Sequence, residues 1–103
     1  MTIWDPDAEP AWPLAVIDLE ATCFPMPGSW PIEVAVAYVE SGARREWLIR
    51  PPEKAFWDPA AIAVTGLTPS FVALHGLPPS QVAADLAEAV AGHTCLSDAP
   101  GSE

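Results

Sequence analysis

One short segment constrains the fold of this chain more than any other. The run from Leu14 to Leu19 is apolar apart from Asp18, and Glu20 follows it directly. A short apolar run of this length, rich in branched side chains, predicts a buried strand. Because the positions before Asp18 are apolar on both sides of that strand, we expect a central strand covered on both faces. The acids lie at its carboxyl end, where open α/β sheets place their functional sites.

The rest of the chain predicts a mixed sheet with a helical crossover, which is an α/β fold with the order β-β-β-α-β. The Ser41-Gly42 pair is a turn signal between two strand-like segments, so a hairpin is expected there. Residues 1–13 are acidic and proline-containing and are expected to form an N-terminal arm, with one domain from 14 to 103. The predicted strands are 14–20, 32–39, 45–50 and 94–97, and the predicted helices are 58–64, 70–74 and 79–91, the last ending at Gly92.

Charge and cysteine content limit the partners of the chain. Fourteen acidic side chains against four basic ones give a net charge of −10, so the overall field repels nucleic acid. The four basic residues, however, all lie between Arg44 and Lys54. They form either a local basic strip that binds phosphate or charged side chains of a hairpin that face solvent. No run of 18 apolar residues occurs, so no membrane span is expected. Two distant cysteines, Cys23 and Cys95, predict free thiols and a cytoplasmic location.

Asp18 and Glu20 are the strongest candidates for chemistry. Side chains alternate along a strand, so both carboxylates point to one face with Cβ atoms roughly 6–7 Å apart. Two carboxylates this close repel one another unless a positive charge lies between them. Mg²⁺ or Mn²⁺ prefers such oxygen ligands, and a pair of these ions can hold both reacting oxygens of a phosphodiester. The same short pattern also occurs where a strand simply reaches the surface, and the motif alone leaves that alternative open.

The order of several motifs resembles the DEDD-type 3′-5′ exonuclease superfamily, which includes ribonuclease T-like and proofreading exonucleases. The segment from Asp18 to Cys23 is similar to the first motif of that family, and Ile32-Glu33 matches the start of its second strand. Thr65 to Thr68 matches a tetrad that follows a short helix in the family. The resemblance covers about residues 14–103 and implies a ribonuclease H-like mixed sheet of the DEDDh type.

The resemblance also implies roles for individual residues. Asp18 would bridge two Mg²⁺ or Mn²⁺ ions and Glu20 would bind one, while Ala21, Thr22 and Leu67 would lie against the terminal nucleotide. Trp30, in the loop after the acids, is a further candidate for stacking on a base. The second catalytic Asp of the family corresponds to a position at about Glu103 or beyond it, and Asp98 is a weaker candidate for that ligand.

The expected function is removal of nucleotides from the 3′ end of single-stranded DNA or RNA. The third family motif, with its His base and last Asp, has no match in the sequence, so the domain is expected to stop before its C-terminal helices and to be inactive as it stands. Apolar surface left exposed in this way predicts self-association. The alternative is a non-catalytic, exonuclease-like interaction module. The choice between DNA and RNA stays open because contacts to the 2′-OH have no visible signature here.

Overall fold

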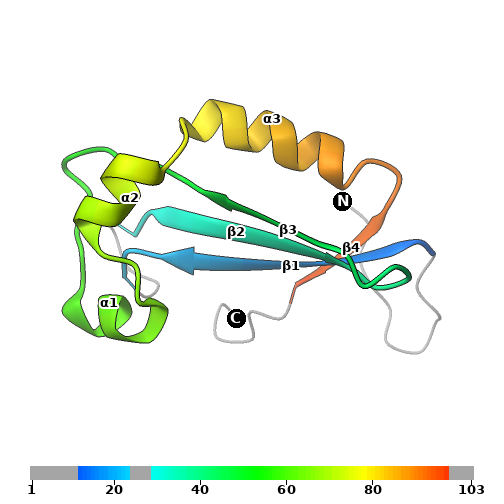
Figure 1. Ribbon diagram of the computed structural model, residues 1–103, viewed down its shortest axis with the longest axis horizontal. Helices are drawn as coiled ribbons and strands as arrows, with labels where there is room; N and C mark the ends of the chain where they lie inside the picture. Colours follow the sequence, from blue (N-terminus) through cyan, green and yellow to red (C-terminus); the bar gives the residue numbers. More distant parts are fainter. Residues whose placement is uncertain (1–11, 24–28, 98–103) are drawn as a thin grey trace.

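The protein contains one four-stranded mixed sheet, which confirms the α/β prediction. The computed structural model describes residues 12–23 and 29–97, and the strands run in the order β3-β2-β1-β4 (Figure 1). All three helices lie between β3 and β4 in the sequence. The strands are β1 (Leu14–Ala21), β2 (Pro31–Tyr38), β3 (Arg44–Leu48) and β4 (Thr94–Ser97), and the helices are α1 (Pro59–Thr65), α2 (Pro69–His75) and α3 (Pro79–Ala89).

The strand that carries Asp18 is an interior strand, as expected from its apolar sequence. β1 pairs antiparallel with β2 on one side and parallel with β4 on the other. β2 continues into β3 through a tight turn, in which Gly42 has a φ of 74° and its N–H donates to the carbonyl of Tyr38 at 2.8 Å. This turn needs a left-handed conformation that glycine adopts without steric strain.

The Thr65–Thr68 tetrad ends one helix and begins the next. Gly66 is the C-cap of α1 with a φ of 74°, and its N–H donates to the carbonyl of Ile62 at 2.8 Å. Thr68 is the N-cap of α2, where its hydroxyl accepts a hydrogen bond from the N–H of Phe71 at 3.3 Å. These are the usual stop and start signals of helices, so local capping chemistry explains two of the four residues in this motif.

α3 covers one face of the sheet, and the main core lies between them (Figure 1). Val82 and Ala89 of α3 are buried against a cluster that includes Val34, Val36 and Trp47. The hydroxyl of Tyr38 donates to the carbonyl of Ala89 at 2.8 Å and joins the end of α3 to β2. The helix ends at Ala89, two residues earlier than predicted, because Ala91 N–H turns to the nearer carbonyl of Glu88.

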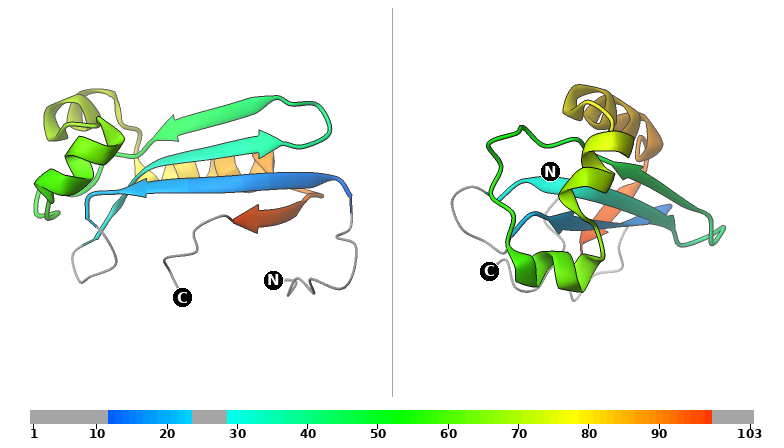
Figure 2. Two further views of the ribbon diagram at one scale, coloured as in Figure 1. Left: turned by 90° about the horizontal axis from the view of Figure 1, so that it is seen from below. Right: turned by 60° about the vertical axis from the view of Figure 1, so that its left-hand side comes forward.

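The expectation that both faces of β1 are covered was wrong for the part of the chain that the structure describes. Within residues 12–23 and 29–97, α3 lies over one face, and no helix lies over the opposite face (Figure 2). α1 and α2 lie at the end of the sheet where β1 terminates (Figure 1). On the face of β1 opposite α3, Val16 is half-buried, whereas the next two positions on that face are Asp18 and Glu20. In the described ranges, no helix is both long and apolar enough for a membrane span.

Candidate active site on the open face of the sheet

Asp18 and Glu20 lie on the face of the sheet opposite α3. Ala15 and Ile17, which precede them on β1, belong to or pack against the core under α3, so alternation along the strand turns the two acids the other way. Asp18 is exposed and Glu20 is half-buried. The predicted pair of carboxylates therefore shares one accessible surface of an interior strand.

The register of the sheet adds two carboxylates to this surface. Glu33 of β2 lies directly opposite Glu20, and Glu46 of β3 lies opposite Ala35, which is itself opposite Asp18. We call Asp18, Glu20, Glu33 and Glu46 the acidic face. The sequence shows the same two-residue alternation in β2 and β3, but the register that aligns these strands with β1 was not predicted, so Glu33 and Glu46 were missed.

One cation partly balances the acidic face. Arg44 of β3 forms an ion pair with Glu46, and both side chains are about half exposed. Within the described ranges this is the one ion pair between side chains. The remaining three carboxylates of the acidic face therefore carry negative charge that no basic side chain in this part of the chain neutralises by direct contact.

The electrostatics of the acidic face favour bound positive charge. Partial burial, followed by the nearby Asp18 carboxylate, raises the pKa of Glu20 above its ordinary value. Burial also raises the pKa of Glu33, reinforced by Glu46, Glu20 and Asp18 and opposed by Arg44. A raised carboxylate pKa means that the ionised form is destabilised here. A proton or a cation held on this face relieves that repulsion.

The donor chemistry of Asp18 and Glu20 suits a hard divalent cation, because carboxylate oxygens are the ligands that such ions prefer. However, among residues 12–23 and 29–97, no group of three or more His, Cys, Asp or Glu side chains is close enough to hold a metal ion. The described acids by themselves therefore form no metal site. Asp98 and Glu103, the predicted additional ligands, lie outside the described residues.

The chain beyond Glu20 is held tightly by backbone hydrogen bonds. The pairing of β1 with β2 shifts register between Glu20 and Ala21. Thr22 is fully buried; its N–H donates to the carbonyl of Trp30 at 2.9 Å, and its hydroxyl accepts from the N–H of Trp30 at 3.1 Å. The Thr22 carbonyl accepts from the N–H of Asp58 at 2.9 Å. These bonds fix the position of the segment, and because Thr22 is fully buried, its contact with a terminal nucleotide stays a prediction.

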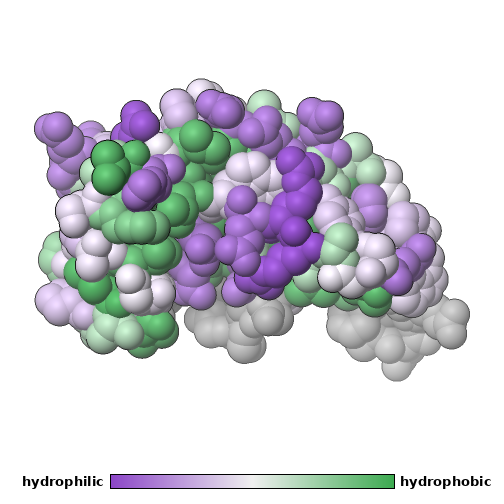
Figure 3. All heavy atoms as spheres, in the orientation of Figure 1, coloured by the Kyte–Doolittle hydropathy of each residue, from purple (hydrophilic) through white to green (hydrophobic). Residues whose placement is uncertain are grey.

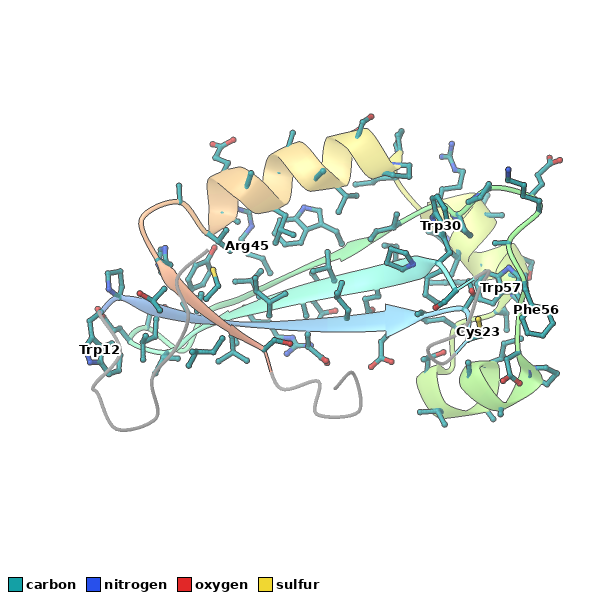
Figure 4. The ribbon with its side chains drawn as sticks, turned by 180° about the vertical axis from the view of Figure 1, so that it is seen from behind. Trp12, Cys23, Trp30, Arg45, Phe56 and Trp57 are labelled. Carbon is teal, nitrogen blue, oxygen red and sulfur yellow. The ribbon has the colours of Figure 1, made fainter. Side chains whose placement is uncertain are left out.

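Ala21, Trp30 and Leu67, the other three predicted substrate contacts, are all half-buried. The indole Nε1 of Trp30 is buried and has no hydrogen-bond partner among the described residues. Figure 4 shows Trp30 at the same end of the sheet as Cys23, Phe56 and Trp57, with Trp12 at the far end. Trp30 thus contributes part of its ring to internal packing, and its stacking on a base stays a prediction.

The thiols are free, as predicted. Cys23 is buried just beyond β1, and Cys95 is exposed on β4 opposite Ala15. Cys23 lies eight positions further along the chain than Ala15, beyond the other end of β1. The two cysteines are therefore at opposite ends of the neighbouring strands β1 and β4.

Comparison with solved structures identifies the fold. No family model matches the chain, and no curated protein sequence matches it. The structure is similar to that of a moderately thermophilic exonuclease I from Methylocaldum szegediense, with a TM-score of 0.68 and 20% identity over 82% of this chain. It is equally similar, at TM-score 0.68 and 19% identity, to the metal-free form of an E. coli exonuclease I complex with single-stranded DNA and to its zinc ion bound form.

These similarities show that the described chain has the ribonuclease H-like fold of exonuclease I, as the sequence predicted. The chain spans about a fifth of the length of those proteins, with 19% of each chain covered in the three comparisons above. At this level of identity the likeness establishes the fold, and the activity has to be argued from the acidic face itself.

Proposed function

We propose that this chain forms the N-terminal part of a metal-dependent 3′-5′ exonuclease domain. The observation that carries the proposal is the placement of Asp18 and Glu20 together on the accessible face of an interior strand, in a sheet with the fold of exonuclease I. Solved structures of exonuclease I include complexes with single-stranded DNA and with a dT13 oligonucleotide. Single-stranded DNA is therefore the first substrate to test, with RNA as the second.

In this proposal Asp18 and Glu20 are the residues of the described chain that would hold the divalent cations. Cations bound there would neutralise charge on the phosphodiester and lower the pKa of the attacking water. The protein's own contribution is a rigid arrangement of acids. β1 pairs with β2 along Asp18 and Glu20, whereas its pairing with β4 ends at Ile17, and the strand backbone keeps the two acids on one face. Further ligands and the base are expected from residues outside the described ranges and from the missing His and Asp of the third motif.

The proposal is tested with single-stranded oligonucleotides labelled at either end. A 3′-5′ exonuclease releases a labelled mononucleotide at once from a 3′-labelled strand and gives a ladder of shortening products from a 5′-labelled strand. The assay is run on the 103-residue chain and, where the natural protein is longer, on that longer protein. Because the described acids are few, we expect activity near background in the short chain and Mg²⁺- or Mn²⁺-dependent cleavage in a protein that supplies the remaining ligands.

Asp18→Ala and Glu20→Ala should abolish that cleavage, since transfer of the phosphoryl group depends on charge held by these two side chains. Glu46→Ala is the matched control, because Glu46 lies on the same face but pairs with Arg44. Cleavage that resists chelator, or that Asp18→Ala leaves unchanged, would overturn the mechanism.

A non-catalytic, exonuclease-like interaction module is the second candidate. Two observations favour it: the described residues bring no three metal ligands together, and several large apolar side chains are exposed around α1 and α2. Figure 3 shows this apolar surface over α1 and α2, beside a strongly hydrophilic middle region. Retained binding of a protein partner by Asp18→Ala, together with no cleavage by the natural protein, would favour this candidate.

A further inference from the structure

A surface hollow lies near the end of β1, between the segment that follows β3 and the start of α2. Its volume is about 550 Å³. It is formed by one aromatic ring, one guanidinium, one carboxylate, three prolines and an alanine: Trp57, Arg50, Glu53, Pro51, Pro52, Pro69 and Ala73. None of these residues belongs to the acidic face, and Arg50 is one of the four basic residues between Arg44 and Lys54. The hollow thus combines a flat aromatic ring with a guanidinium group.

Arg50 is held firmly in place. Its backbone N–H donates to the carbonyl of Leu77 at 2.9 Å, and its Nη2 donates to the carbonyl of Gly76 at 2.9 Å. The approach is so close that a Cβ on Gly76 would lie 2.7 Å from the backbone nitrogen of Arg50. A guanidinium has five N–H donors, so one bond leaves most of them available. Among the described residues no carboxylate pairs with Arg50. A positioned guanidinium of this kind suits a phosphate.

Trp57 supplies the ring. It is half-buried, and the next residue, Asp58, donates its N–H to the carbonyl of Thr22. This bond ties the Trp57 segment to the end of β1, two residues past Glu20. Figure 4 shows Trp57 beside the end of β1 and close to Cys23. Stacking on such a ring is available to any nucleobase, because every base has a π face.

The hollow is linked to the acidic face through β3 as well. Leu48, the last residue of β3, lies opposite Glu33, and Ile49 donates its N–H to the carbonyl of Ile32 at 2.8 Å. Arg50 follows immediately. The hollow and the acidic face are thus attached to the same end of the sheet through both β1 and β3.

We propose that this hollow is a nucleotide subsite, in which a base stacks on Trp57 and the adjoining phosphate is bound by Arg50. The proposal rests on the proposed function, and it deepens it by naming where single-stranded substrate is held away from the reacting phosphodiester. Such a contact also explains how a chain with a net charge of −10 binds a polyanion: the attraction is local, and stacking adds to it without charge. Glu53 on the same wall opposes the phosphate and keeps the affinity modest.

The experiment measures binding without cleavage. A fluorescent 5′-labelled oligothymidylate is titrated with the protein in the presence of chelator, and anisotropy reports the affinity. Loss of a stacked base costs about 1–3 kcal/mol, which corresponds to roughly five- to 150-fold in affinity. We expect Trp57→Ala to weaken binding by about ten-fold and Arg50→Ala by a similar factor. Trp57→Phe, which keeps a ring, should retain most of the affinity.

Matched controls remove the same groups elsewhere. Arg45 lies over the Trp47 ring at 4.8 Å, and Trp12 is 57% exposed at the far end of the molecule (Figure 4). Arg45→Ala and Trp12→Ala should leave the affinity unchanged. Glu53→Gln removes the opposing charge from an exposed position, so it should tighten binding about two-fold or more without affecting folding.

Several outcomes would overturn the subsite. One is an equal loss of oligothymidylate affinity in Arg45→Ala and Arg50→Ala. Another is an unchanged affinity in Trp57→Ala or in Glu53→Gln. The third is that the hollow binds a proline-rich peptide in place of the oligonucleotide. The cleavage assay separates the two proposals. Metal-dependent cleavage with unaltered binding by the Arg50 and Trp57 variants rejects the subsite and keeps the exonuclease. Binding that depends on Arg50 and Trp57 in a natural protein that never cleaves keeps the subsite and rejects the exonuclease. A protein that binds no oligothymidylate rejects both.

Discussion

The two faces of the sheet are built from the same strands, and they have opposite physical characters. Under α3, Ala15, Val34, Val36 and Trp47 are almost fully buried in one apolar cluster. On the other side of the same strands lie Asp18, Glu20, Glu33 and Glu46. The first face lowers the free energy of folding by removing apolar area from water, at roughly 25 cal/mol per Å². The second face collects like charges, which repel one another and destabilise the fold. Apolar packing and negative charge are thus separated across the thickness of one sheet.

The largest effect should come from Trp47→Ala on the apolar face. Removing a buried tryptophan deletes its packing and leaves a cavity, which costs about 3–5 kcal/mol. That is a large fraction of the roughly 5–15 kcal/mol that stabilises a typical domain. Urea denaturation followed by circular dichroism measures the loss. Glu46→Ala is the matched control, because Glu46 is the preceding residue and points to the other face; a comparable loss in Glu46→Ala would contradict the separation of the two faces.

A smaller loss of folding stability is expected for Gly76→Ala, which tests whether close packing extends to the end of the sheet. The added Cβ would lie 2.5 Å from the carbonyl oxygen of Val72 and 2.7 Å from the backbone nitrogen of Arg50, so the backbone must shift. Overpacking of this kind costs about 1–3 kcal/mol. The same denaturation experiment measures it, and Gly76→Ala should also weaken oligothymidylate binding, because it displaces Arg50. An unchanged midpoint of urea denaturation would show that the backbone between α2 and α3 moves to accept the added Cβ at little cost in stability.

Cations should partly reverse the unfavourable charge of the acidic face. At a Mn²⁺ concentration ten times the dissociation constant, binding to the folded state alone adds about 1.4 kcal/mol of stability. Thermal unfolding in Mn²⁺ and in chelator measures this shift, and calorimetry gives the affinity, which we expect to be weak. Asp18→Ala should remove the stabilisation. A shift of the same size in Asp18→Ala would mean that the metal binds elsewhere.

The smallest effect is a pH dependence carried by Glu33. Because its pKa is raised in the folded protein from the ordinary value of 4.5, the folded state keeps this proton to higher pH than the unfolded chain does. Stability from this group is therefore present below pH 4.5 and is lost as the pH rises through the raised folded pKa. Glu33→Gln should remove this slope and stabilise the protein near neutral pH by a few tenths of a kcal/mol. The midpoint of urea denaturation, measured across the pH range, gives this dependence of stability on pH. A steeper fall of stability with rising pH in Glu33→Gln would contradict this explanation.

Local signals in the sequence predicted most of the elements. Asp58 before Pro59 and Gly66 after Thr65 specify the ends of α1 through hydrogen bonds within a few residues, and the structure contains both caps. The end of α3 was predicted two residues too late. The prediction took Gly92 as the stop signal, whereas in the structure Ala89 is the last residue of the helix and Val90 is its C-cap. Strand ends shifted by one or two residues because they depend on partner strands, which local sequence does not encode.

The sequence by itself determined that the two candidate acids share a face: two-residue alternation puts Asp18 and Glu20 on one side of β1 whatever the rest of the chain does. It also determined the mixed sheet, because the hydrophobic periods of strand and helix differ along the chain. Only the tertiary structure decided the neighbours of those acids. Register sets Glu33 opposite Glu20, and register follows from which side chains α3 buries. The hollow forms where Pro69 and Ala73 of α2 lie beside the segment of Arg50 and Trp57. Those contacts join residues far apart in the sequence, and their energies depend on packing that no local pattern contains.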